Sequence, residues 1–208
     1  MQVVLPVIYG AALGAVLAVP ARLLCNFLFQ QRGIEQSMER LHFLILLIGM
    51  ALLGGVIGWQ AGVTFRGLYL LLLLLVSACV FYTDAVRRII PNELVLAILV
   101  LAAVFGLTGA IRFQIWQSLL GLVVCFVIFF LPGLFGKAVG AGDVKLAAAM
   151  GFALGLTGSL YAIAGMGALV LLFVLFDRRL PIAQRLKEMV PMGPFLALGL
   201  VAVAIILG

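Results

Sequence analysis

The sequence has little charge. Charged residues make up 10% of its 208 residues and hydrophobic residues 66%, whereas a soluble domain carries about 25% charged residues. The core of a soluble domain cannot bury so much apolar surface. The composition therefore excludes a soluble enzyme and a soluble binding module. We therefore predict an all-α protein, a polytopic integral membrane helical bundle in which residues 1–208 form a single domain.

Cysteine and histidine are also scarce. Cys25, Cys79 and Cys125 stand far apart, no C-x-x-C is present, and His42 is the single histidine. The ligand spacing of a zinc site is therefore missing, and each cysteine is most simply a small buried hydrophobe. We expect no metal and no cofactor.

The basic residues outnumber the acidic ones and give a formal charge of +6. In a membrane protein, Lys and Arg set the topology by staying on the cytoplasmic side, so we expect the lipid bilayer as surroundings and no nucleic-acid partner. A signal peptide carries positive charge before its apolar region, whereas the first basic residue here, Arg22, follows it. The first apolar segment is therefore expected to be an uncleaved span with its N-terminus outside.

Apolar segments of the length that crosses a bilayer, about 17–25 residues, recur along the chain. The candidate spans are 3–21, 42–61, 67–83, 94–111, 114–135, 144–158, 160–176 and 192–208. The region 146–176 carries no charge and fits either one long helix or two short ones. The sequence GLTGS at 155–159 favours a turn and hence two short helices.

The positions of the charges decide between seven and eight spans. Eight spans, with both termini outside, place all 13 Lys and Arg residues except Arg66 and Arg112 on the inner side. Seven spans would move Arg178, Arg179, Arg185 and Lys187 outside, so the positive-inside rule favours eight. The same topology makes residues 22–41 a short cytoplasmic loop and puts all seven carboxylates inside. Any chemistry is therefore expected at the cytoplasmic face.

Two of these carboxylates, Asp84 and Asp143, lie at the ends of spans and at the same membrane depth. Carboxyl groups that approach closely cannot both ionise, so such a pair holds a shared proton. One member can then deprotonate a water while the other polarises a carbonyl. Alternatively, Asp143 caps its helix and Asp84 pairs with Arg87 or Arg88. The residues alone leave this choice open.

Three segments resemble, in order, the motifs of bacterial type IV prepilin peptidases, which are GxGD membrane aspartic proteases. They are TDAVRRIIPN at 83–92, GAGDVKL at 140–146 and PMGPFLALG at 191–199, and the resemblance covers about residues 70–208. It implies an aspartic endopeptidase that cuts the basic leader from prepilins or pseudopilins, the substrates of type IV pilus and type II secretion systems. The cut would fall at the cytoplasmic border of the bacterial inner membrane, with Asp84 and Asp143 as the catalytic residues.

The neighbours of the two aspartates are candidates for binding substrate or shaping the site: Pro91, Asn92, Glu93, Gly140, Gly142 and Lys145. The glycines allow another chain to approach closely. Lys145 either tunes the pair or extends to the membrane interface. Glu93 either caps the span 94–111 or joins Glu35 and Glu39 in attracting a basic leader.

One departure from the family is the short loop 22–41. Many bacterial members carry there an insert with paired C-x-x-C motifs and also methylate the new N-terminus. The absence of such an insert argues against zinc and against N-methyltransferase activity. Two alternatives are another GxGD-type intramembrane protease and a proton-coupled transporter, which would need carboxylates deeper in the spans.

Overall fold

The structure is a computed structural model and describes residues 4–135, 140–176 and 192–207, without the side chains of 173–176. Every regular element in these residues is an α-helix. The helices are α1 (Val4–Gln31), α2 (Arg40–Ala61), α3 (Phe65–Arg87), α4 (Asn92–Leu107), α5 (Ile115–Leu134), α6 (Ala141–Phe176) and α8 (Gly193–Leu207). Five of them, namely α1, α2, α3, α5 and α6, are long and apolar enough to cross a membrane. The chain is therefore an all-helical integral membrane protein, while the count of eight spans stays a prediction.

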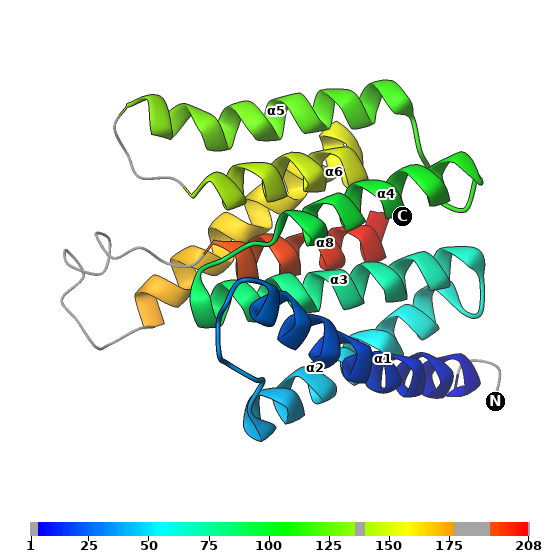
Figure 1. Ribbon diagram of the computed structural model, residues 1–208. Helices are drawn as coiled ribbons and strands as arrows, with labels where there is room; N and C mark the ends of the chain where they lie inside the picture. Colours follow the sequence, from blue (N-terminus) through cyan, green and yellow to red (C-terminus); the bar gives the residue numbers. More distant parts are fainter. Residues whose placement is uncertain (1–3, 136–139, 177–191, 208) are drawn as a thin grey trace.

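Helix α6 consists of two helices that meet at Gly155. This glycine has φ 68° and ψ 179°, a conformation that residues with a side chain rarely adopt. Figure 1 shows the chain turning back within α6, so that its second half returns towards the end where α6 begins. The break falls at the first residue of the turn predicted at 155–159.

The helices run alternately up and down the bundle. In Figure 1 the C-terminal ends of α1, α3 and α5 lie at one end, together with the N-terminal ends of α2, α4, α6 and α8. Asp84 belongs to the last turn of α3 and Asp143 to the first turn of α6. Both aspartates therefore lie at this end, which we call the aspartate end.

Helix α3 is the central helix of the bundle. It packs against α1, α2, α4 and α8. Of its most apolar stretch of 18 residues, 72% is buried inside the protein, whereas the corresponding share in the other four long helices is 22–28%. This position gives the carboxyl group of Asp84 a rigid, buried support.

Helix α1 is longer than predicted, because it continues through the first half of the predicted loop 22–41 and ends at Gln31. Arg22 therefore sits on a helix, where its guanidinium lies 4.9 Å from the centre of the Phe43 ring. The side-chain oxygen of Asn26 accepts a hydrogen bond from the backbone N–H of Met38 at 2.9 Å, which holds the loop against α1. Residues 22–31 of the predicted cytoplasmic loop are therefore helical, and the non-helical connection between α1 and α2 is shorter than residues 22–41.

Candidate active site

Asp84 is held at the C-terminal end of α3. Its backbone carbonyl accepts a hydrogen bond from the N–H of Arg88 at 2.8 Å, and Arg88, with φ 54°, ends the helix. The residue is 5% exposed. A carboxyl group so far from water needs either a polar partner or a chemical role.

The N-terminus of α8 supplies a partner for Asp84. The backbone N–H of Gly193 donates a hydrogen bond to Oδ2 of Asp84 over 3.0 Å. A Cβ atom at position 193 would lie 2.7 Å from this oxygen, so only glycine fits. The segment PMGPFLALG, which contains Gly193, therefore orients the carboxyl group of Asp84 in the segment TDAVRRIIPN.

Asp143 lies in the first turn of α6 and is partly buried. Its Oδ1 atom is buried and has no hydrogen-bond partner among the described residues. A Cβ atom at Gly140 would lie 2.7 Å from Oδ2 of Asp143, so the glycine leaves the room that this carboxyl group occupies. Asp143 thus lies at the start of α6, at the end of the bundle where Asp84 lies at the end of α3.

The turn that follows Asp84 packs on the turn that precedes Asp143. A Cβ atom at Gly142 would lie 3.0 Å from Cβ of Ile90, so the glycine allows this close approach. Pro91 then precedes the first residue of α4, and its carbonyl accepts a hydrogen bond from the N–H of Leu94 at 3.1 Å. The segments TDAVRRIIPN and GAGDVKL are therefore in direct contact.

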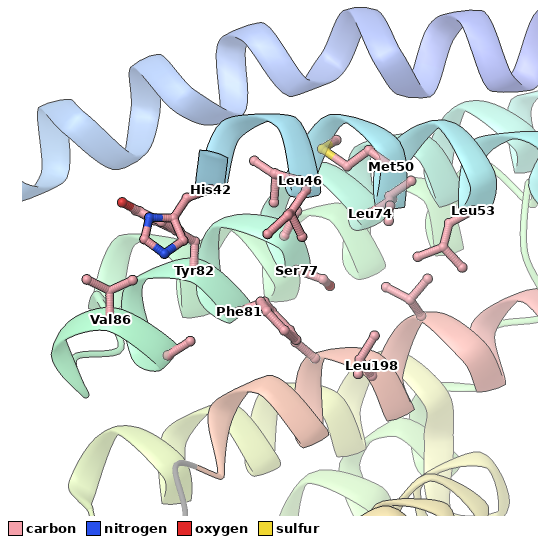
Figure 2. A pocket seen from close by; sticks show the side chains of 16 residues that line it. His42, Leu46, Met50, Leu53, Leu74, Ser77, Phe81, Tyr82, Val86 and Leu198 are labelled. Carbon is pink, nitrogen blue, oxygen red and sulfur yellow. The ribbon is translucent and has the colours of Figure 1, made fainter. Parts of the chain in front are cut away.

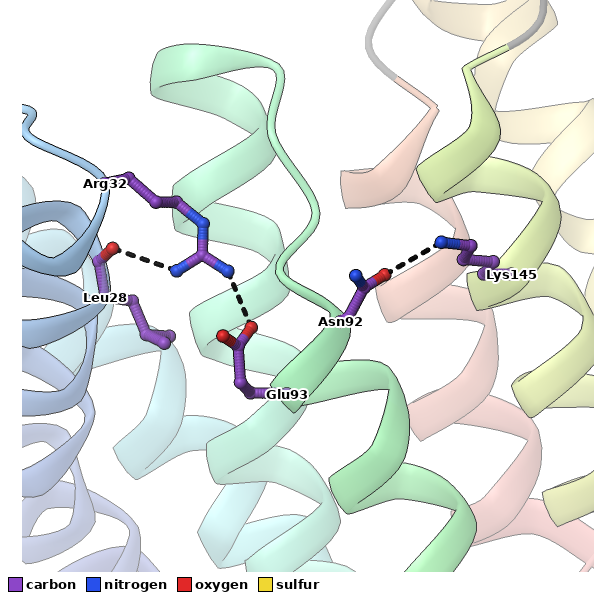
Figure 3. Close-up of polar contacts among 5 residues, drawn as sticks. All are labelled: Leu28, Arg32, Asn92, Glu93 and Lys145. Carbon is purple, nitrogen blue, oxygen red and sulfur yellow. Dashed lines mark hydrogen bonds and ion pairs between the residues drawn. The ribbon is translucent and has the colours of Figure 1, made fainter.

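Asn92, Glu93 and Lys145 form polar contacts at the aspartate end, in the first turns of α4 and α6 (Figure 3). Nζ of Lys145 donates to Oδ1 of Asn92 at 3.1 Å, which ties α6 to α4. Arg32 forms an ion pair with Glu93 at 2.6 Å and donates to the carbonyl of Leu28 at 3.0 Å, which ties α4 to α1. These three predicted residues thus hold helices together at the aspartate end.

The alternative pairing of Asp84 with a neighbouring arginine is not found in the described residues, where neither Arg87 nor Arg88 forms an ion pair with it. Nε of Arg87 donates instead to the side chain of Gln36 in the α1–α2 loop. Glu39 lies in the same region with Oε2 3.6 Å from Nδ1 of His42. The acids Asp177 and Glu188 lie outside the described residues.

Gly193 and Ile90 belong to the site but were not among the predicted site residues. Both lie within the quoted motifs PMGPFLALG and TDAVRRIIPN, which is the signal that could have pointed to them. Within the described part of the chain, no group of three or more His, Cys, Asp and Glu side chains is placed to hold a metal ion.

Two carboxyl groups that share one proton can divide acid and base work between them. Residues 68–176, which include both aspartates, match the family model described as the type IV leader peptidase family. No match to a curated protein or to a solved structure was found. Since the matched segment makes up more than half of the chain, the protein belongs to the type IV leader peptidase family.

Proposed function

We propose that the protein is a membrane-embedded aspartic endopeptidase that removes the basic leader from type IV prepilins or pseudopilins. The observation that carries this proposal is geometric: Asp84 in the last turn of α3 and Asp143 in the first turn of α6 lie at the same end of the bundle, where the segments that hold them are in contact. Membership of a leader peptidase family supports the same reaction class. This assignment gives a chemical role to two carboxyl groups that lie in an otherwise apolar chain.

In the proposed reaction the pair carries one proton. The ionised carboxylate takes a proton from a water molecule as its oxygen attacks the carbonyl carbon of the scissile peptide bond. The protonated carboxyl group at the same time donates its proton to the carbonyl oxygen. Collapse of the tetrahedral intermediate breaks the C–N bond, and a proton passes to the leaving amine. The titration belongs to the pair, so neither role is assigned to one residue.

The site is proposed to face the cytoplasm from the bacterial inner membrane, in an eight-span chain with both termini outside. This orientation places most basic residues inside and brings the site to the depth at which a leader meets an apolar segment. Glu93, already paired with Arg32 at 2.6 Å, is the weaker candidate for attracting a basic leader. Glu35 and Glu39 remain the candidates in the α1–α2 region.

The test is cleavage of a prepilin by the purified protein in detergent, read by mass spectrometry of the product. The mass gives the position of the cut and shows whether a methyl group is added, which we do not expect. Asp84→Asn and Asp143→Asn should each reduce cleavage by about a thousandfold or more, because each removes a group that transfers a proton. Both variants should unfold at the temperature of the wild type.

Full activity of either variant would overturn the assignment of the catalytic pair. Cleavage of unrelated membrane helices at the same rate as of the prepilin would favour a general GxGD-type intramembrane protease. Proton-coupled uptake by the protein in vesicles, without any cleavage, would favour the transporter.

A further inference from the structure

A small hollow of about 60 Å³ lies at the end of the bundle opposite the two aspartates. Arg66 in the first turn of α3 and Arg112 in the connection between α4 and α5 both line it, together with residues of α6 and α8. We call it the two-arginine hollow. These are the two basic residues that the positive-inside rule leaves on the outer side, and the fold brings them to one place.

Within the described residues, no carboxylate of the protein balances these two charges. Neither arginine forms an ion pair there. The carboxylates that the structure describes belong instead to the aspartate end: Glu35, Glu39, Asp84, Glu93 and Asp143. Two positive charges that line one hollow repel each other, so their shared position favours an anion from outside the protein.

The packing of the helices explains the place of only one of the two arginines. Arg66 donates a hydrogen bond to the carbonyl of Ile205 in the last turn of α8 at 3.0 Å. The last carbonyls of a helix have no partner within it, so this bond caps α8. Arg112 has no such partner in the part of the chain that the structure describes. Its neighbour Phe113 packs on Phe152 of α6, with ring centres 5.6 Å apart, and holds the segment beside the hollow.

The two-arginine hollow adjoins a larger hollow of about 630 Å³ between α2, α6 and α8, whose walls are mostly aliphatic. We call this one the apolar hollow. Val203 and Leu207 of α8 line both. Along α8 the apolar hollow reaches from Leu207 to Leu198, which is about 14 Å at about 1.5 Å per residue. This length is about half of a hydrocarbon core about 30 Å thick, the depth that an acyl chain of one leaflet covers.

The apolar hollow ends near the middle of the bundle, where a groove of about 320 Å³ between α2, α3 and α8 begins (Figure 2). The two share Leu53, Leu198 and Val201. Figure 2 shows Leu53 and Leu198 at the end of the groove that lies away from His42, and His42 belongs to the first turn of α2, at the aspartate end. A molecule that fills the apolar hollow therefore covers only the half of the bundle that ends at the two arginines.

We propose that a phospholipid with an anionic headgroup binds here, with its phosphate at Arg66 and Arg112 and an acyl chain in the apolar hollow. Guanidinium groups bind phosphate through charge-assisted hydrogen bonds. A headgroup without a cation of its own suits this place, because no described carboxylate lies there to bind an ammonium group. The ligand is thus of the phosphatidylglycerol type. The site is separate from the aspartates, so this proposal does not depend on the peptidase function.

The first test is native mass spectrometry of the purified protein in a neutral detergent, titrated with phosphatidylglycerol. Arg112→Gln should raise the Kd of the first bound lipid about tenfold, because it removes a charge-assisted hydrogen bond. Arg40→Gln is the matched control, since Arg40 is also exposed and lines neither hollow. An unchanged Kd in Arg112→Gln, or an equal rise in Arg40→Gln, would overturn the site.

Two other ligands separate the headgroup from the rest of the lipid. Phosphatidylcholine should bind the wild type at least about tenfold more weakly than phosphatidylglycerol, because its choline group brings a cation to the arginines. Inorganic phosphate should also bind more weakly by about tenfold or more, because it leaves the apolar hollow unfilled. Equal affinity for phosphatidylcholine would overturn the anionic headgroup, and equal affinity for inorganic phosphate would overturn the lipid.

Gly165→Phe and Gly167→Phe test the place of the acyl chain. Both positions are exposed helical glycines of α6 at which a Cβ atom meets nothing within 4 Å, but only Gly165 lines the apolar hollow. A phenylalanine ring at 165 should occupy the hollow and raise the Kd for phosphatidylglycerol about fivefold, whereas one at 167 should leave it unchanged. Equal Kd values for the two variants would overturn this placement of the chain. Equal unfolding temperatures without lipid show that both variants are folded.

Discussion

At the scale of single residues, Gly193 controls how the carboxyl group of Asp84 is oriented. Its N–H donates to Oδ2 at 3.0 Å, and the lack of a side chain lets the start of α8 touch Asp84. Gly193 is therefore a positioning residue that acts through Asp84.

Gly193→Ala should lower cleavage by about a hundredfold, because its Cβ atom would lie 2.7 Å from Oδ2 of Asp84 and displace a group that must be placed within about 1 Å. The measurement is kcat and KM on a prepilin, with the loss expected in kcat. Gly167→Ala is the matched control, since a Cβ atom at this helical glycine meets nothing within 4 Å. Similar losses in the two variants would show that Gly193 has no special role.

The sequence predicted the two aspartates because an acid in an apolar chain is conspicuous and their motifs are specific. It did not predict the contact between Asp84 and Gly193, since helical periodicity describes the faces of one helix and not which helix end meets another.

At the scale of elements, glycines set the distance between α1 and α2. A Cβ atom at Gly54 would lie 2.3 Å from the carbonyl oxygen of Gly10, and one at Gly58 would lie 2.1 Å from that of Pro6. Helices in membranes associate closely where small residues face one another. The pair α1–α2 thus forms a support beside the central helix α3.

Gly54→Ala should destabilise this helix pair by about 1–3 kcal/mol, because the backbones must separate to admit the methyl group. The measurement is thermal unfolding in detergent, with a Tm several degrees below that of the wild type. Gly55→Ala is the neighbouring control, as its Cβ atom would make an ordinary contact of 3.6 Å with Cβ of Ala11. A Tm for Gly54→Ala that equals the Tm for Gly55→Ala would contradict the packing argument.

Most helices were predictable from apolar length, but their ends were less so. A charged residue such as Arg22 need not end a helix. Helix α1 continues to Gln31 and ends shortly before Gly33, which has a φ of 67°. Likewise α4 ends at Leu107 and not at 111, just before Gly109 with φ 72°. Hydropathy locates a span, whereas backbone conformation ends a helix.

At the scale of the whole molecule, the proposed function requires the aspartate end to face the cytoplasm. The α1–α2 loop, with the exposed residue Ser37, lies at that end. The α2–α3 turn, with Val63 at 84% exposure, lies at the other. Residues at the two ends can therefore report the orientation.

A membrane-impermeant maleimide should label Val63→Cys in intact bacteria and Ser37→Cys only after the membrane is opened, because the positive-inside rule keeps the α1–α2 loop in the cytoplasm. The native cysteines, Cys25, Cys79 and Cys125, are each 0% exposed, so the unmodified protein is the control and should stay unlabelled. Labelling of Ser37→Cys in intact cells, with Val63→Cys protected, would place both aspartates on the outer side. A leader that remains in the cytoplasm could then not be the substrate, so this measurement tests the orientation independently of any assay of cleavage.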